Sequence, residues 1–379
     1  MRVGLVCPYS LSVPGGVQGQ VMGLGRELRA RGIEVRVLAP CDGVPPEPWV
    51  HPIGTSVMNP SNGSVAPIAP DLHAQVRTMR TLRDEDFDIV HLHEPLVPGP
   101  CATTLVLKPA PLVGTFHAAG DPSDYKSYAW VARPLARRID ALVAVSPDAQ
   151  AMAQPTVGGR WNVLFNGVEV DRFRSAVPWP RADERRVVMF VGRHEERKGL
   201  ATLLQAMSHL PDDVTLWVAG DGPETDTLQA RHRGDHRIEW IGRVTDDERD
   251  ARMAAADVFC APSLGGESFG VILLEAMAAG TPVVASGISG YTGVAGPLDA
   301  NPAAAELVPP GDAVALGAAL RRVLDDPAEA ERLREAGSER ADRFSMARLV
   351  DHYVAIYERV RAEVPRDRRH APVSWAGPR

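Results

Sequence analysis

The sequence predicts an α/β protein made of two doubly wound domains, each a parallel β-sheet covered by helices. Short apolar runs alternate with segments of helical periodicity along almost the whole chain, the pattern of parallel sheets with helical crossovers. The pattern lapses at residues 166–168 and through the polar, proline-containing stretch 171–186. A chain of 379 residues is also longer than one hydrophobic core usually serves. We therefore expect domains at 1–170 and 171–354, with about 355–379 packing back on the first domain or disordered.

Buried strands and connecting helices are expected in both domains. The apolar runs are short and apolar on both faces, as in parallel strands covered by helices. A first helix is expected over about 18–31, and the final helix, about 346–360, is expected to cross back to the N-terminal domain. Such sheets bind ligands at the carboxyl ends of their strands, so two in tandem favour a cleft between them. The expected strands are 2–7, 34–39, 89–93, 112–116, 141–146, 187–191, 215–219, 238–242, 258–261 and 282–285.

Composition excludes several classes of protein. The net charge is −7 and neither half of the chain is basic overall, which argues against a nucleic-acid partner. No apolar run approaches a membrane span, and the N-terminus reads as a buried strand rather than a secretory signal. The four cysteines are scattered without metal or redox spacing, so we expect reduced thiols, a cytoplasmic protein and no metal site.

The most informative segment is the loop and helix that contain Glu267 and Glu275. Ser268 is expected to cap the helix and Gly280 to end it, with a strand after Pro282. Both carboxylates can then face a ligand and accept sugar or ribose hydroxyls. The backbone N–H groups of Ser268, Phe269 and Gly270 would point out of the helix start, where the helix dipole favours phosphate.

Two cations follow the first strand of the second domain. Arg193 and Lys198 stand in the turn Gly-Arg-His-Glu-Glu-Arg-Lys-Gly. An arginine can fork two phosphate oxygens and a lysine supplies a point charge, so together they suit a diphosphate. Alone, either could belong to a solvated surface loop, but beside Glu267 and Glu275 they indicate a binding site.

Weaker signals lie in the first domain. Paired glycines at Gly15-Gly16 join a strand to a helix, where backbone N–H groups can approach an anion, but no dinucleotide or Walker motif is formed. His117 follows the strand 112–116 at its carboxyl end. His91 and His93 alternate with apolar residues, so one of the pair is expected to pack inside.

These residues resemble the retaining glycosyltransferases of the GT-B superfamily, in particular its large fourth sequence family. The resemblance covers nearly the whole chain, and within the family the local matches are numerous with the phosphatidylinositol mannosyltransferases of actinobacteria. Those enzymes transfer mannose from GDP-mannose to the inositol of a membrane lipid. The segments that carry the resemblance are 7–10, 13–18, 62–66, 86–95, 115–117, 166–173, 192–199 and 260–275.

The resemblance implies roles for individual residues. Gly16, Arg193 and Lys198 would hold the diphosphate, and Glu275 would take the ribose. The remaining implied roles place Glu267 on the mannose hydroxyls, Arg243 and Val244 near the base, His117 near the transferred sugar, and Tyr9, Gln18, Asn62 and Ser64 on the acceptor side. Catalysis would rest on His117, Glu267, Arg193 and Lys198, with the cations aiding departure of the nucleotide diphosphate and no metal or other cofactor required.

Departures from the family pattern fall on the acceptor side. Pro67 and Ala69 stand where basic residues are expected after the Asn62–Ala66 loop. From Asp71 to Arg83, apolar residues face one side of a helix and basic residues lean to the other, as in an interfacial anchor, although a solvated face is an equal alternative. The sequence thus predicts α-mannosyl transfer from GDP-mannose to phosphatidylinositol at the inner face of the membrane. Open alternatives are a UDP-sugar transferase with a soluble acceptor such as an inositol phosphate, and an inactive sugar-nucleotide sensor.

Overall fold

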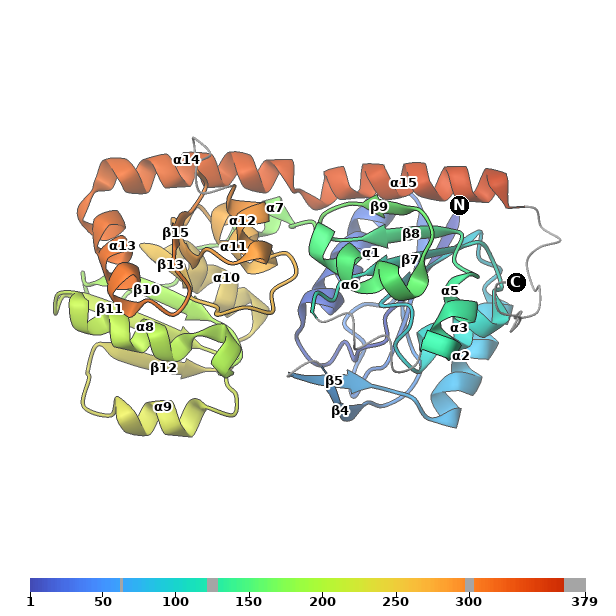
Figure 1. The fold of residues 1–379 in the computed structure, drawn as a ribbon, viewed down its shortest axis with the longest axis horizontal. Helices are drawn as coiled ribbons and strands as arrows, with labels where there is room; N and C mark the ends of the chain where they lie inside the picture. The colour runs from blue at the N-terminus through green and yellow to red at the C-terminus, as the bar shows by residue number, and fades with distance from the viewer. Residues whose placement is uncertain (62–63, 121–128, 297–302, 365–379) are drawn as a thin grey trace. The chain divides into compact units, whose positions relative to one another are not determined.

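The computed structural model describes residues 1–61, 64–120, 129–296 and 303–364. The chain forms two compact units (Figure 1). The first contains Met1–Gly167 and the chain from Met346 onward, and the second contains Val168–Ser345. Each unit has its own parallel sheet and its own core, and each is described separately below.

The first unit is built on a seven-stranded sheet with strand order β3-β2-β1-β6-β7-β8-β9. All pairings within it are parallel. A separate antiparallel hairpin pairs β4 (Val57–Ser61) with β5 (Ser64–Ile68). The sheet strands are β1 (Arg2–Val6), β2 (Glu34–Ala39), β3 (Val50–Pro52), β6 (Ile89–His93), β7 (Leu112–Phe116), β8 (Ala141–Ala144) and β9 (Trp161–Val163).

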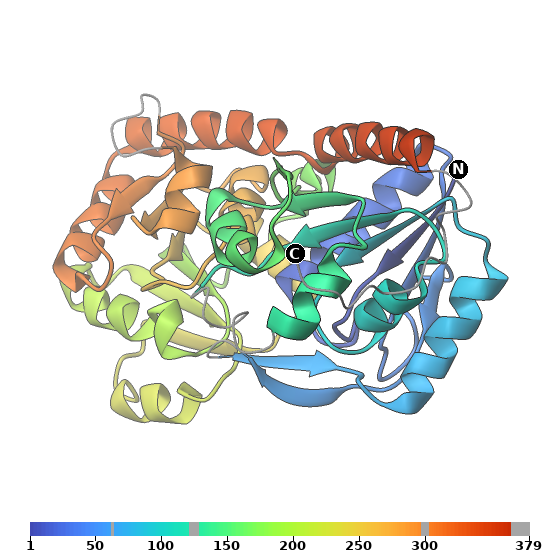
Figure 2. The same cartoon turned by 45° about the vertical axis from the view of Figure 1, so that its right-hand side comes forward.

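Helices cover both faces of this sheet (Figures 1 and 2). One face packs on α1 (Gly16–Ala30) and α15 (Met346–Glu363). The other packs on α2 (Leu72–Asp84), α3 (Pro100–Leu107), α5 (Ala129–Ala136) and α6 (Pro147–Val157). Alternate residues of each strand enter the two cores, which explains why the strands read as apolar throughout.

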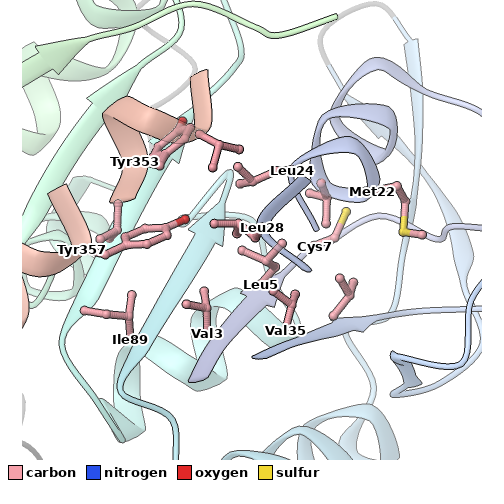
Figure 3. Close-up of a cluster of buried hydrophobic side chains, with 14 of the residues drawn as sticks. Val3, Leu5, Cys7, Met22, Leu24, Leu28, Val35, Ile89, Tyr353 and Tyr357 are labelled. Atoms are coloured by element: carbon pink, nitrogen blue, oxygen red, sulfur yellow. The ribbon is translucent and has the colours of Figure 1, made fainter. Parts of the chain in front are cut away.

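The last helix, α15, completes the core of the first unit. Tyr353 and Tyr357 lie in one cluster with Leu24 and Leu28 of α1 (Figure 3). Both tyrosines are at least 98% buried, and their hydroxyls find partners on the sheet, as described below. The expected return of the C-terminal helix to the N-terminal domain is confirmed.

The second unit is built on a six-stranded parallel sheet with order β12-β11-β10-β13-β14-β15. Its strands are β10 (Arg186–Val191), β11 (Val214–Ala219), β12 (Ile238–Gly242), β13 (Val258–Ala261), β14 (Val283–Ser286) and β15 (Glu306–Val308). Its helices are α7 (Val170–Arg174), α8 (Leu200–Ala206), α9 (Thr225–Arg231), α10 (Asp246–Ala255), α11 (Val271–Ala278), α12 (Ser289–Ala295), α13 (Ala313–Asp325) and α14 (Pro327–Arg343), with short 3-10 turns at Glu196–Lys198 and Met207–His209.

The expected strands are confirmed, most of them within one residue at each end. The short strands β3, β9 and β15 and the hairpin of β4 and β5 were not predicted. Other differences concern helices and connections. The first helix begins at Gly16, two residues early, because the glycine pair itself forms the start. The stretch 171–186, expected as linker, includes most of α7, and the units change over after Gly167. The final helix runs on to Glu363, and the chain returns to the first unit at Met346 rather than near 355.

Candidate active site

The sheet of the second unit changes its direction of growth between β10 and β13. The chain adds β11 and β12 on one side of β10, and then β13, β14 and β15 on the other. Open α/β sheets bind ligands at the carboxyl ends of their strands at such a switch point. The loops 192–199 and 262–270 leave β10 and β13 there, so both segments expected to bind the donor flank the switch point.

The two loops are pressed together by backbone contacts. The Leu264 N–H donates to the Arg197 carbonyl oxygen at 2.8 Å. Gly199 has φ +69°, and a Cβ there would lie 2.0 Å from the Pro262 carbonyl oxygen. A side chain at 199 would therefore force the loops apart, which makes glycine a requirement for the geometry of the site.

The loops bring charged side chains into one cluster. Glu267 Oε1 accepts from Lys198 Nζ at 2.5 Å and pairs with Arg197 Nη1 at 3.1 Å. Glu195 pairs with Arg193 Nε at 2.9 Å and with Arg197 Nε at 3.1 Å. Three cations and two carboxylates leave an excess of positive charge, which suits an anionic ligand, and the carboxylates hold the cations in place.

The cluster joins three of the residues that the sequence singled out and adds two that it missed, Glu195 and Arg197. Lys198 and Glu267 are in direct contact, while Arg193 joins them through Glu195 and is 45% exposed. Arg197 was not predicted, although it bridges both carboxylates. Its signal was present in the Arg-Lys pair before Gly199, but the spacing alone does not show which of two adjacent cations turns inward.

The helix α11 begins later than the sequence predicts. Gly270 is its N-cap with φ +84°, and the first helical residue is Val271, so the prediction that Ser268 caps the helix is wrong. A Cβ on Gly270 would lie 2.7 Å from the Tyr291 ring, and Phe269 is buried with its ring 5.7 Å from that of Phe344. The loop through 268–270 is therefore shaped by packing. The expected end of the helix is confirmed, since Gly280 has φ +77° and β14 follows.

Glu275 lies in the second turn of α11 and is half-buried. Burial raises the pKa of its carboxyl group, and the guanidinium groups of Arg249 and Arg172 oppose that rise. Arg249 itself pairs with Asp250 at 2.9 Å. The predicted ribose contact of Glu275 stays a prediction. The structure adds that the positive charge of Arg249 acts on the Glu275 carboxyl group.

The loop after β12 carries the residues predicted to lie near the base. Val244 is half-buried just beyond the strand, and Arg243 extends to Asp221 at 3.5 Å. Asp221 itself follows β11, the neighbouring strand. Both residues therefore lie at the same sheet edge as the charged cluster.

The sheet of the first unit has its own switch point, between β1 and β6. The N-terminus of α1 lies beyond β1 and is exposed, and Gly15 gives no side-chain cap. A Cβ on Gly15 would lie 2.4 Å from Gln18 Oε1, whereas a Cβ on Gly16 would meet nothing within 4 Å. Uncapped N–H groups at the start of a 15-residue helix, with open space at Gly16, suit an anion.

His117 is held at the carboxyl edge of the first sheet by its main chain and its ring. Glu94 Oε1 accepts from the backbone N–H groups of His117 and Ala118, each at 2.6 Å. The ring contacts His93 through Nε2 at 3.0 Å and hydrogen-bonds the Asn166 side chain. Burial lowers the pKa of His117 to about 4, so the ring is neutral near pH 7.

Both histidines of the pair His91 and His93 are buried, where only one was expected inside. His91 Nδ1 contacts the Tyr357 hydroxyl and Nε2 contacts the Thr115 hydroxyl, both at 2.7 Å. Residues two apart on a strand share a face, and α15 covers that face. The alternation of the two histidines with apolar residues therefore reflects a strand buried on both faces, with both histidines on the face that α15 covers.

The residues predicted on the acceptor side differ in what the structure shows of them. Gln18 is buried and its amide N–H groups donate to the carbonyl oxygens of Ser10 and Val13, so it shapes the loop after β1. Tyr9 forms a β-bridge with Ile68 that joins this loop to the hairpin. Ser64 is the first residue of β5, and Asn62 lies outside the described residues. Their acceptor roles stay predictions.

The helix predicted as a membrane anchor forms as α2 with Asp71 as its N-cap. It buries Ala74, Thr78, Thr81 and Leu82, so Leu82 belongs to the core and not to an outer apolar face. Leu72 is 70% exposed and Met79 is 37% exposed, next to exposed Arg77, Arg80 and Arg83. Within the described residues, no group of three or more histidine, cysteine or acidic side chains could hold a metal ion.

Comparisons with known proteins agree in the family they indicate. The family model described as glycosyltransferase family 4 matches residues 14–172, and the model described as glycosyl transferases group 1 matches residues 171–340. Among solved structures, the chain resembles HepE of Anabaena in complex with UDP, with a TM-score of 0.71 and 20% identity over 95% of this chain and 100% of that one. It also resembles a sucrose-phosphate synthase of Thermosynechococcus elongatus, with a TM-score of 0.72 and 22% identity over 96% of this chain and 100% of that one. These likenesses show that the fold is that of GT-B glycosyltransferases.

Relatives whose sequences are more similar to this chain than those of the solved structures above identify a family within the family-four glycosyltransferases. A phosphatidyl-myo-inositol mannosyltransferase of Mycobacterium leprae is 40% identical over 95% of this chain and 97% of its own length. The proteins of the same name from Mycolicibacterium smegmatis and Mycobacterium tuberculosis are 38% and 37% identical, each over 95% of this chain and at least 94% of their own. The chain therefore belongs to the phosphatidyl-myo-inositol mannosyltransferase family of the family-four glycosyltransferases.

Proposed function

We propose that the protein transfers an α-mannosyl residue from GDP-mannose to the inositol of phosphatidylinositol, with retention of configuration. The observation that carries the proposal is the contact of Lys198 and Arg197 with Glu267 at the switch point between β10 and β13, in a chain 40% identical to a phosphatidyl-myo-inositol mannosyltransferase. Cations that face a carboxylate provide the two halves of a sugar diphosphate site.

The donor is held by charge. Lys198 and Arg193 take the diphosphate. Phosphate binding draws Lys198 from Glu267, whose carboxylate is then free to accept sugar hydroxyls. As the glycosidic bond breaks, negative charge grows on the leaving diphosphate and the fixed cations stabilise it, an electrostatic role that requires no metal ion.

The acceptor is a lipid, and α2 provides the surface that would meet the membrane. Leu72 and Met79 project from the outer side of the helix although apolar residues of this size are usually buried. Arginines beside them favour anionic headgroups, and each cation near such a surface contributes roughly 1 kcal/mol, which adds to the insertion of the two apolar side chains. Within the described residues, no helix has the length and apolar character needed to cross a bilayer.

The direct test is a transfer assay with two donors and two acceptors. Radiolabelled GDP-mannose and UDP-glucose are each offered phosphatidylinositol vesicles or free inositol phosphate. Label passing from GDP-mannose into the lipid is the expected result. Label confined to the water-soluble product would replace the lipid with a soluble acceptor, transfer only from UDP-glucose would replace the donor, and donor binding without transfer or hydrolysis would indicate a sensor.

Matched variants separate the parts of the proposal. Lys198→Met should weaken GDP binding by about 10-fold or more, since a charged hydrogen bond is worth about 1.5–3 kcal/mol. Arg321→Met on α13, an exposed cation away from the cluster, is the control and should leave GDP binding unchanged. For the membrane, Leu72→Ser with Met79→Ser should reduce binding to anionic vesicles, while Val314→Ser, which removes an apolar side chain 63% exposed in the second unit, should not.

A further inference from the structure

Three imidazoles stack at the carboxyl edge of the first sheet. The ring centroids of His91 and His93 are 4.3 Å apart with an interplanar angle of 30°, and those of His93 and His117 are 5.2 Å apart at 21°. All three side chains are at least 94% buried. His93 Nδ1 lies 3.0 Å from His117 Nε2, so the second and third rings are also joined by a hydrogen bond.

That hydrogen bond has a direction. Burial holds the pKa of both rings below the ordinary histidine value, so each ring is neutral and has one donor and one acceptor nitrogen. Either His93 Nδ1 donates to His117 Nε2, or the reverse. The choice also decides which nitrogen of each ring remains for other partners.

The remaining nitrogens decide between the two. His93 Nε2 is buried and has no hydrogen-bond partner within the part of the chain that the structure describes. A buried N–H without an acceptor is rarer in native proteins than an unsatisfied acceptor, so the proton of His93 belongs on Nδ1. His117 Nε2 is then the acceptor. Because the neutral ring carries one proton, that proton is on Nδ1.

We infer that His93 is a positioning residue for His117: its Nδ1–H occupies the Nε2 lone pair of His117 and fixes that ring in the Nδ1–H tautomer. The inference rests on the proposed function and on the expected place of His117 near the transferred sugar. It adds that His117 acts as a neutral, oriented ring and is not a proton shuttle.

The neighbouring residue supports the same task. Glu94 has φ +50°, an uncommon conformation for a residue with a side chain, and in it the carboxylate reaches the backbone N–H groups of His117 and Ala118. Two consecutive residues at the end of β6 thus hold His117, with Glu94 on the main chain and His93 on the ring. The strand next to β7 therefore holds both the main chain and the ring of His117.

Two amide variants test which nitrogen of His93 matters. The amide of asparagine falls near the position of Nδ1, and that of glutamine near Nε2. His93→Asn should keep the donor to His117 and retain kcat within a few-fold of wild type. His93→Gln should lower kcat roughly 10-fold to 100-fold, the range for losing a residue that orients an active-site group, with little change in KM for GDP-mannose. Activity in Gln but not in Asn, or unchanged kcat in both, would refute the inference.

A spectroscopic measurement tests the tautomer without relying on activity. In the ¹⁵N-labelled wild-type protein, His117 is identified by the signal lost in His117→Asn, and its nitrogen shifts report which atom carries the proton. Protonation at Nδ1 in wild type and His93→Asn, and loss of that preference in His93→Gln, is expected. Protonation at Nε2 in wild type would overturn the inference even if both variants failed to fold. Absence of mannosyl transfer by a wild-type protein with the Nδ1–H tautomer would instead refute the proposed function alone.

Discussion

Acid should destabilise the first unit before it reaches the range in which most carboxylates titrate. Burial lowers the pKa of His91 to about 3 and that of His117 to about 4, against an ordinary value of 6.5. At a pH between 6.5 and these folded pKa values, the histidines are protonated in the unfolded chain but neutral in the folded chain. The folding stability of the first unit is therefore highest above about pH 6.5, and it decreases as the pH falls toward the folded pKa values of His91 and His117.

The size of the effect follows from the shifts. One pKa unit corresponds to about 1.36 kcal/mol. At pH 5 the solution is about 1.5 units below the unfolded pKa of 6.5, so each of the two histidines takes away about 2 kcal/mol. Together they remove about 4 kcal/mol, a large part of the roughly 5–15 kcal/mol that holds a domain folded. His93, whose pKa burial also lowers, acts in the same direction.

Hydrogen exchange of peptides from β6 and β7, followed in urea between pH 7 and pH 5, measures this loss in the first unit alone. His91→Gln keeps a polar group near Thr115 and removes one titrating ring, so the slope of unfolding free energy against pH should fall by up to about 1.36 kcal/mol per unit. His73→Gln, at a side chain 97% exposed on α2, is the control. Equal slopes in wild type and His91→Gln would refute the reasoning.

Three further predictions concern the second unit. Glu267→Gln should bind GDP at least as tightly as wild type, because Lys198 loses its competing carboxylate, yet transfer should fall at least 10-fold; calorimetry and the transfer assay would contradict this if GDP binding weakened or turnover held. Glu275→Gln should lower transfer without lowering the melting temperature, since burial already disfavours the charged form of this carboxyl group, and near-normal transfer would argue against the assigned site. Gly220→Ala places a Cβ 1.9 Å from the carbonyl oxygen just beyond β10 at φ +125°, so the melting temperature should fall by several degrees, and a wild-type melting curve would show that the loop adapts freely.

The sequence was sufficient for the central strands of both sheets because parallel strands buried on both faces leave an unambiguous apolar run. The edge strands β3, β9 and β15 were not predicted, since each has only three residues. The strands Ile89–His93, Leu112–Phe116 and Ile238–Gly242 have the bounds that the pattern predicts. Site loops were also readable where glycine is required by close approach, as at Gly199 against Pro262. These features depend on residues near one another in the chain.

Features that depend on distant contacts were not readable. The start of α11 is decided by Tyr291, which packs on Gly270 from another helix. The burial of His91 depends on Tyr357, which is 266 residues further along the chain. Glu94 reads as an ordinary acidic residue after a strand, and only its positive φ and its contact with the His117 N–H group show its part in the site.

In the proposed function, Glu267 explains how the charged cluster can bind the donor and still favour release of the product. In the free protein its carboxylate neutralises Lys198 and Arg197, so a diphosphate must displace it and part of the binding free energy is spent on that exchange. When the sugar is present, the displaced carboxylate has hydroxyl groups to accept from and the exchange is compensated. A bare nucleotide diphosphate offers no such groups, so it is bound less tightly than the charge of the cluster alone would allow. The ion pairs therefore favour release after transfer, while interactions with the sugar offset their loss during it.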